Sequence, residues 1–182
     1  MKRIIKSMED KYLIISLDMV QQTFEDSETK EDALIVRNLI EEIRSKKYYV
    51  KELELIMVNE LDEVIGYAMF SRFHLEGKYD NELLLLSPVA VKTKYQRQHI
   101  SKELIEYGFI KAKAMGYKAV IVEGNPQNYK NRGFQTSYQF GINAHPSIGL
   151  PHPDCLMVKE LYEGALNGIS GLVEYSMYEA LR

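Results

Sequence analysis

The spacing of apolar residues predicts two helices near the start of the chain. In each helix the apolar residues recur every three or four positions and therefore share one face. The two stripes are Leu13, Leu17, Val20 and Phe24, and then Val36, Leu39, Ile40 and Ile43. Ser7 and Thr29 are each followed by an acid at the third position, so we expect both residues to be helix caps. A short strand is expected before the first helix, at residues 2–6.

The pattern then changes to that of β-strands. Residues 52–58 and 64–75 are rich in branched and aromatic side chains and flank a polar turn, as in an antiparallel hairpin. The run at 82–91 is apolar at nearly every position, which is typical of a central strand buried on both faces. Pro88 lies inside this run and cannot donate a ladder hydrogen bond. It predicts either a bulge or the point where pairing to one neighbour stops.

The following segments predict a βαβ unit. A helix over residues 99–115, ended by Gly116, connects the strand at 82–91 to another buried strand at 117–123. Two strands joined by such a crossover are parallel. Two shorter elements follow, a helical turn at 126–132 and a strand at 155–160.

Composition narrows the class of protein. A chain of 182 residues with 46% hydrophobic and 27% charged residues can form one globular domain with its own core. A net charge of −3 without a basic block argues against a broad nucleic-acid surface. No apolar run is long enough for a membrane helix. The single cysteine, Cys155, excludes an internal disulfide and fits a reducing compartment, so we expect a cytoplasmic protein.

One loop is distinguished by its charge. No acidic residue occurs from Ser87 to Lys102, although this segment also contains Lys92, Lys94 and Arg97. The helix that follows has no Ser, Thr, Asp or Asn at its expected cap, so its first N–H groups need another acceptor. A phosphate group would be a suitable acceptor. Water would also suffice, with the basic side chains merely solvated, and the residues alone leave both interpretations open.

The segment Tyr95–Ser101 resembles the Gln/Arg-x-x-Gly-x-Gly/Ala signature of the GNAT N-acetyltransferase superfamily. The likeness extends to further segments: Ser87–Val91, Gly116–Val120 and, as in one bacterial branch of the family, Gly124–Phe134 and the tail at 165–175. This resemblance implies a single α/β domain over residues 1–182. Its central sheet would be mixed and mostly antiparallel, with one parallel βαβ pair and helices on both faces.

The same resemblance implies a reaction and its partners. Acetyl-CoA would be the acetyl donor, and the acceptor would be a primary amine of a small molecule or a peptide. No nucleic acid, membrane or metal is expected to take part, and a homodimer is compatible with the fold. Some metal-capable residues do lie near one loop, but their spacing matches no ligand pattern: His145, His152, Asp154 and Cys155.

Functional residues are carried over from the family by position. The pyrophosphate-binding loop corresponds to Gln96, Arg97, Gln98, His99, Ile100 and Ser101, and the strand that pairs with the pantetheine arm to Val89, Ala90 and Val91. Asn125 would bond the pantetheine amides or cap its own short helix. Tyr129 corresponds to the tyrosine that protonates the leaving sulfur, although its ring could also simply pack against its surroundings. Glu82 and His74 are candidate general bases, but neither matches a motif.

His99 departs from the family pattern. It stands where the family has its first glycine, and Ser101 stands where the family has glycine or alanine. Glycine allows the backbone to approach the phosphates closely, whereas an imidazole could crowd them or donate a hydrogen bond to them. His99 therefore favours the alternative of a non-catalytic, CoA-binding sensor or interaction protein with a GNAT fold. Asn125 and Tyr129 favour the enzyme.

Overall fold

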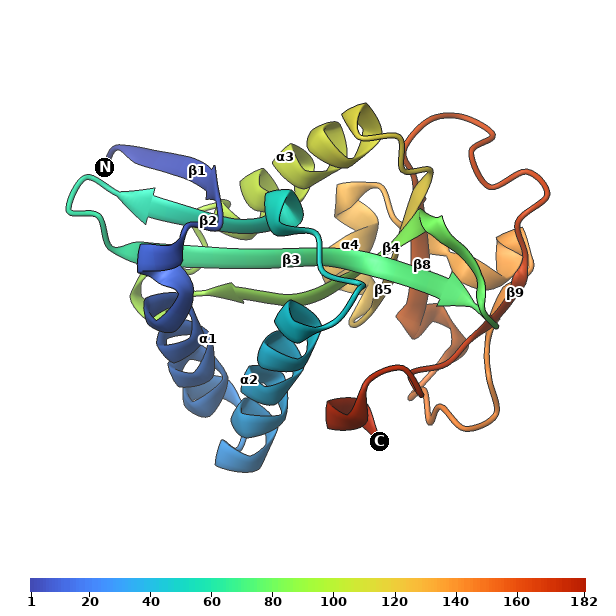
Figure 1. Cartoon of the computed structure of the whole chain (residues 1–182), viewed down its shortest axis with the longest axis horizontal. Coiled ribbons are helices and arrows are strands. Elements are labelled where there is room, and N and C mark those ends of the chain that lie inside the picture. The colour runs from blue at the N-terminus through green and yellow to red at the C-terminus, as the bar shows by residue number, and fades with distance from the viewer. The chain divides into compact units, whose positions relative to one another are not determined.

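The computed structural model describes all 182 residues. The strands are β1 (Arg3–Ser7), β2 (Glu54–Asn59), β3 (Val64–Leu75), β4 (Lys78–Val91), β5 (Ala119–Glu123), β6 (Gln135–Thr136), β7 (Ile142–Ala144), β8 (Leu156–Glu160) and β9 (Gly171–Val173). The helices are α1 (Leu13–Ser27), α2 (Lys30–Ser45), α3 (Ile100–Ala114) and the single turn α4 (Pro126–Tyr129). Seven strands form one sheet in the order β1-β2-β3-β4-β5-β8-β6, and β7 pairs with β9 (Figure 1).

The predicted βαβ unit and mixed sheet are confirmed. β4 and β5 are parallel, with Leu83 opposite Ala119 and Leu85 opposite Ile121, and α3 connects them. Antiparallel pairing joins β1 to β2, β2 to β3, and β8 to both β5 and β6. No helix has the length and apolar character that crossing a bilayer requires.

Some predicted boundaries and one predicted cap are wrong. Ser7 does not cap α1, because it is the last residue of β1 and its hydroxyl donates to the Glu52 carbonyl oxygen at 2.7 Å. A 3₁₀ turn leads into α1 instead. The cap of α2 is confirmed, since Thr29 Oγ1 accepts from the Asp32 N–H at 3.0 Å. β4 begins earlier than predicted because the turn before it is completed at Gly77, which has a φ of 81°.

The chain forms two compact units. The first contains Met1–Ser71, Ser87–Gly108 and Ser176–Arg182, and the second contains Arg72–Leu86 and Phe109–Tyr175. The elements β3, β4 and α3 therefore contribute residues to both units. A single domain over residues 1–182 stays a prediction.

In the first unit, side chains of β2 and β3 alternate between two helical layers. Met57 lies opposite Gly66, and a Cβ atom on Gly66 would lie only 2.6 Å from Ile100 Cγ2, so the glycine lets α3 approach the sheet. Ile56 lies opposite Tyr67, so these two side chains project to the other face. There α1 and α2 pack against each other below the strands in the view of Figure 1.

A buried ion pair connects this helical layer to the sheet. Glu54 of β2 is 0% exposed, and Arg44 of α2 donates a hydrogen bond to it through Nε at 2.9 Å and forms an ion pair with it through Nη2 at 2.8 Å. Tyr49 and Tyr67 also donate their hydroxyls to its two oxygens. Arg44 donates further to Ser16 of α1 at 3.1 Å. Burial, reinforced by the carboxylate, raises the pKa of Tyr67 well above its ordinary value, so this phenol stays a donor.

Replacing Arg44 by methionine should destabilise the protein strongly. The carboxylate of Glu54 would remain buried without a counter-charge, which costs roughly 3–5 kcal/mol of unfolding free energy. Urea denaturation at neutral pH measures this loss. The matched control is Arg37→Met, because Arg37 pairs with the exposed Asp18 and such a pair is worth less than about 1 kcal/mol. Equal losses in the two variants would contradict the importance of the buried pair.

In the second unit, β5 forms the centre of the core. Its residues Ala119, Val120, Ile121 and Val122 are at most 1% exposed. β8 pairs along the whole of β5 and then with the short β6. The ring of Phe109 from α3 lies 5.5 Å from that of Phe134, which precedes β6. These contacts hold the segment after β5, which contains Asn125 and Tyr129, against the core.

Candidate active site

The loop between β4 and α3 has an unusual backbone. Arg97 and His99 both have positive φ angles, 62° and 63°, with one residue between them. A series of N–H groups along the loop and the first turn of α3 donates to no backbone carbonyl: those of Arg97, Gln98, His99, Ile100 and Lys102. When positive and negative φ angles alternate from residue to residue, successive N–H groups point into a concavity that suits anions. The positive end of the α3 dipole adds to the attraction.

His99 adopts the backbone conformation that glycine favours. Its φ of 63° lies in the left-handed region, which histidine enters more easily than most residues but less easily than glycine. Compared with the family signature, position 99 therefore has a different side chain but keeps a backbone conformation that glycine favours. The imidazole itself is exposed.

Glu63, which the sequence did not single out, anchors the start of this loop. It forms ion pairs with Lys92 and, at 3.6 Å, with Lys94, and it accepts a hydrogen bond from the Tyr95 hydroxyl at 3.1 Å. The hydrogen bond from Lys92 is the main reason why the pKa of Glu63 falls to about 2. The two lysines are thus paired with a carboxylate of the protein and are not merely solvated. Arg97 has no carboxylate partner.

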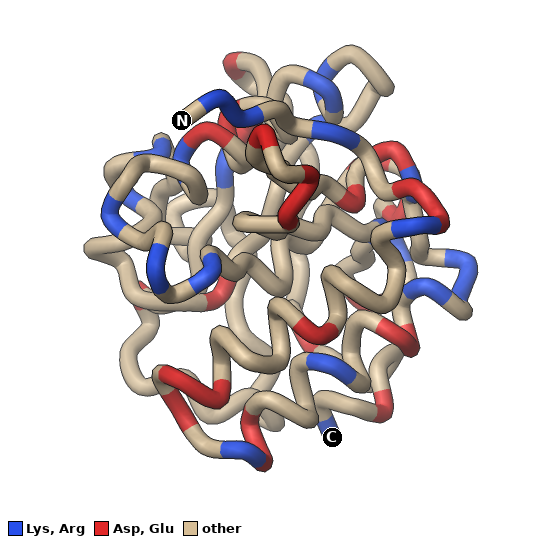
Figure 2. The backbone as a smooth tube through the Cα atoms, turned by 90° about the vertical axis from the view of Figure 1, so that its left-hand side faces the viewer, with Lys and Arg blue, Asp and Glu red and all other residues tan.

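The remaining charge on the molecule is mixed. In the view of Figure 2, basic and acidic segments are interspersed over the face that is drawn. Lys102, at the start of α3, lies 4.0 Å from Glu106 one turn later. The positive potential at the loop therefore comes chiefly from Arg97 and from the backbone N–H groups.

Pairing between β4 and β5 ends before Pro88. The last paired residues are Leu85 and Ile121, whereas β4 continues to Val91. Of the two outcomes that Pro88 predicted, the structure thus shows that pairing to one neighbour stops. The half of β4 that follows has an edge without a strand partner.

The predicted residues Val89, Ala90 and Val91 lie on this edge. The Lys92 N–H donates to the Ile65 carbonyl at 3.0 Å on the β3 side. Because hydrogen-bonding direction alternates along a strand, the N–H groups of Val91 and Val89 point away from β3. The side chain of Gln96 donates to the Val91 carbonyl at 3.1 Å and so connects the loop before α3 to the end of β4.

Tyr129 and Asn125 lie together in the second unit, just after β5. A Cβ atom on Gly124 would lie 2.6 Å from Tyr129 Cε2, so only glycine lets this ring take its place. The ring of Phe134 meets that of Tyr129 edge-on at 5.6 Å. The Tyr129 hydroxyl has no hydrogen-bond partner in the protein, and burial raises its pKa above the ordinary value. Asn125 does cap α4, because its Oδ1 accepts from the Gln127 N–H at 3.0 Å.

The predicted site residues therefore form two groups, one in each unit. The first comprises Val89–Val91 and Gln96–Ser101, and the second comprises Asn125 and Tyr129.

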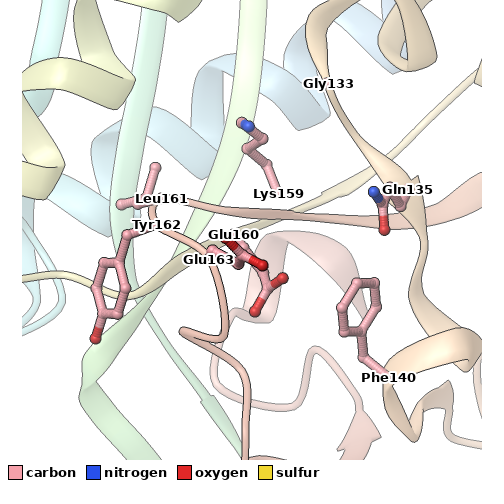
Figure 3. Close-up of a pocket in the computed structure, with 8 residues that line it drawn as sticks. All are labelled: Gly133, Gln135, Phe140, Lys159, Glu160, Leu161, Tyr162 and Glu163. Carbon is pink, nitrogen blue, oxygen red and sulfur yellow. The ribbon is translucent and has the colours of Figure 1, made fainter.

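None of these residues lines either of two pockets in the second unit. One pocket, of about 230 Å³, is bordered by Gly133, Gln135, Phe140 and Lys159–Glu163, and Figure 3 shows Lys159 on the opposite side of β8 from the Glu160 and Glu163 carboxylates. The other, of about 320 Å³, lies in the proline-containing loop.

Two comparisons of the sequence identify the family. The model of the acetyltransferase (GNAT) family matches residues 14–138. The chain is also 32% identical over 126 residues to the uncharacterized N-acetyltransferase YhbS of Escherichia coli strain K12, covering 68% of this chain and 71% of YhbS. The chain belongs to the GNAT acetyltransferase family. The resemblance carried by the Tyr95–Ser101 and Gly124–Phe134 motifs is thereby confirmed.

Solved structures agree on the GNAT fold. The crystal structure of Escherichia coli YhbS in complex with CoA has a TM-score of 0.84 and 24% identity, and the match covers 97% of this chain and 91% of that one. A GNAT acetyltransferase from Brucella melitensis in complex with acetyl-CoA has a TM-score of 0.72 and 18% identity, with coverage of 100% and 99%. The mixed sheet with its single parallel pair is thus the sheet of this family.

Glu63 should make the stability of this GNAT domain pH-dependent in the acid range. Its pKa is about 2 in the folded protein against 4.5 ordinarily, so its stabilising contribution is full above about pH 4.5 and is lost as the pH falls through 2. Urea midpoints at a series of pH values should therefore fall more steeply on acidification in the wild type than in Glu63→Gln. Parallel profiles would show that Glu63 does not anchor the loop.

Proposed function

We propose that this protein is an N-acetyltransferase that uses acetyl-CoA to acetylate a primary amine of a small molecule or a peptide. The observation that carries the proposal is the loop before α3. There, left-handed residues at Arg97 and His99 leave consecutive N–H groups without a carbonyl acceptor. Membership of the GNAT family supports the reaction class, and the CoA and acetyl-CoA complexes of similarly folded proteins support the donor.

The residues of the loop fit a diphosphate. A diphosphate needs several donors that converge without a nearby carboxylate. The segment Lys92–Lys102 contains no acid, and Glu63, which approaches its start, is neutralised by Lys92 and Lys94. Two other carboxylates lie near it and have partners: Asp26 accepts from the Thr93 hydroxyl at 2.5 Å, and Glu103 in the first turn of α3 is paired with Arg3. The residues that would hold the diphosphate are Gln96, Arg97, Gln98, His99, Ile100 and Ser101.

The unpaired edge of β4 fits the amide-containing pantetheine arm. An extended chain of amides can add to an exposed strand edge through main-chain hydrogen bonds. Val89, Ala90 and Val91 would provide this edge, since the β5 register ends at Leu85. Asn125 would bond a pantetheine amide through Nδ2, because its Oδ1 already caps α4.

The chain's own groups meet two demands of acetyl transfer. Acetyl-CoA, when bound, supplies a thioester carbonyl carbon that a neutral amine can attack. The N–H group of Val89, directed away from β3, would stabilise the negative charge that develops on the carbonyl oxygen. Tyr129 would donate its proton to the leaving sulfur as the carbon–sulfur bond breaks, because burial keeps its hydroxyl protonated at neutral pH. The phenolate would regain a proton as the acetylated nitrogen releases one, so that the products are the amide and the free thiol.

Calorimetric titration with acetyl-CoA tests the anion site. We expect Arg97→Ala to raise the Kd about tenfold, the typical cost of one lost charge-assisted contact. Lys94→Ala should change the Kd little, because Lys94 is paired with Glu63.

His99→Gly should bind acetyl-CoA equally well or more tightly, since the backbone at position 99 already has a conformation that glycine favours. A large loss on His99→Gly would show that the imidazole is itself a phosphate ligand, and no binding by the wild type would overturn the proposal.

Tyr129→Phe should separate catalysis from binding. Removing a general acid costs roughly 10²–10⁴-fold in kcat, while the Kd for acetyl-CoA should stay within about twofold. Release of free thiol over a panel of amines measures the rate, with the exposed Tyr107→Phe as the matched control. An unchanged kcat would remove Tyr129 from the mechanism. Binding of acetyl-CoA without thiol release from any amine would favour the non-catalytic alternative.

A further inference from the structure

The pocket of about 320 Å³ in the second unit is bordered by no residue that the proposed acetyl transfer uses. Three segments form its wall: the 3₁₀ turn Ser137–Phe140, the stretch at 143–150, and the residues around the start of β8. Pockets that hold small molecules typically measure about 300–1,000 Å³. This pocket is therefore large enough for a small organic ligand.

Hydrogen bonds between distant parts of the chain hold the wall of the pocket in shape. β7 pairs with β9, where Ala144 lies opposite Val173, and the His145 N–H donates to the Val173 carbonyl at 2.8 Å. The Ile148 N–H closes a turn by donating to the His145 carbonyl at 2.9 Å. Leu156 belongs to β8, which pairs along the whole of β5. The pocket is thus a part of the folded structure and needs no ligand to form.

The lining of the pocket is uncharged and mostly apolar. No aspartate, glutamate, lysine or arginine borders it. Apolar or aromatic residues border it from all three segments: Tyr138, Ala144, Ile148, Leu150, Pro153 and Leu156. Moving a charged group into such surroundings without a counter-charge is costly. The ligand that fits this lining is therefore uncharged.

One buried hydroxyl on the wall lacks a partner. Ser137 is 1% exposed, and its hydroxyl forms no hydrogen bond with another group of the protein. The oxygen is not sealed inside the protein either, so another molecule can reach it from the pocket that Ser137 borders. A buried hydroxyl without a partner is destabilising. A ligand that carries a hydroxyl group would provide the missing hydrogen bond.

His145, a second polar residue of the wall, has a defined tautomer. Its Nδ1 accepts from the Ser147 N–H at 3.0 Å and lies 2.8 Å from Ser147 Oγ. A ring nitrogen that accepts a hydrogen bond carries no proton, so the proton of the imidazole is on Nε2. The ring can therefore donate to a ligand through Nε2, which favours a ligand oxygen over a ligand cation.

We propose that this pocket is a second ligand site, which binds an uncharged aromatic molecule with a hydroxyl group, that is, a simple phenol. The hydroxyl would bond Ser137, and the ring would contact Leu150 and Leu156. Tyr138 favours an aromatic ligand, because its side chain is half exposed at the wall and aromatic pairs attract each other beyond the area that they bury. The site is separate from the residues proposed to hold acetyl-CoA.

Titration of the intact protein with 4-methylphenol, toluene and 4-methylbenzoate, followed by ¹⁵N NMR, tests the site. The three probes share a methylated ring and differ only in carrying a hydroxyl, no polar group or a charged carboxylate. 4-Methylphenol should shift the amide signals of Ser137, Ala144 and Ile148 saturably, with a Kd of about 1 mM for a ligand of this size. 4-Methylbenzoate should bind at least about tenfold more weakly, because its charge has no partner in the lining.

Three variants assign the contacts. Ser137→Ala should weaken the binding of 4-methylphenol about fivefold, the usual effect of one neutral hydrogen bond, and should leave the binding of toluene unchanged. Ser147→Ala is the matched control, because Ser147 is exposed in the same part of the chain and does not border the pocket. It should leave the affinity for both probes unchanged. Leu150→Asp should abolish the binding of both, because it places a charge in the lining.

Two results would overturn the proposal. The first is equal affinity for 4-methylphenol in Ser137→Ala and the wild type, provided that amide signals outside the pocket show the variant to be folded. The second is the absence of saturable shifts at the three amides of the wild type, which would mean that water alone satisfies the hydroxyl. All three variants should bind acetyl-CoA with the Kd of the wild type, so the proposed function is tested separately.

Discussion

The proposed chemistry depends on one local constraint, which is that the chain enters α3 without satisfying its own N–H groups. A helix start of this kind normally has a side-chain cap. Here the positive φ angles at Arg97 and His99 turn the backbone so that the N–H groups lack carbonyl acceptors. An anion is the ligand that such an arrangement suits, and a diphosphate is large enough to use several donors at once.

The surroundings of the loop keep this arrangement in place. Glu63 fixes the lysines at its start, and Gln96 ties its middle to the end of β4. β4 stops pairing with β5 after Leu85, so an open strand edge leads along the chain into this loop.

A second arrangement is built around a glycine after β5. Gly124 allows the Tyr129 ring to lie against the backbone, and Glu123 before it is the one exposed residue of β5. Direct contact with a carboxylate would raise the pKa of the phenol further and occupy its proton.

Local patterns predicted the parts of the structure that depend on neighbouring residues. The apolar stripe and the Thr29 cap of α2, the continuous apolar run of β4 and the position of Gly116 each express a rule that spans a few residues. The sequence also singled out the loop before α3, since the absence of acids and of a cap is visible there, and it left a phosphate and water both open as acceptors for the N–H groups.

The features that the sequence did not indicate all involve distant partners. Glu63 meets Lys92, which is 29 residues away, and Glu123 meets Tyr175, which is 52 residues away. Ser7 matches the capping pattern but is the last residue of β1, because the pairing of β1 with β2 extends as far as Ser7 and Leu55. Nothing in the local sequence of a lone glutamate distinguishes one that anchors a distant segment from one that is only solvated.

The most direct test of the anion site is a ¹⁵N NMR titration of the intact protein with adenosine 3′,5′-bisphosphate, inorganic pyrophosphate and CoA in turn. If the loop holds the diphosphate, pyrophosphate and CoA will both shift the backbone amide signals of Arg97, Gln98, His99 and Ile100, and the bisphosphate, which lacks a diphosphate, will shift them less. Saturable CoA binding that leaves these four amides unmoved would contradict the account.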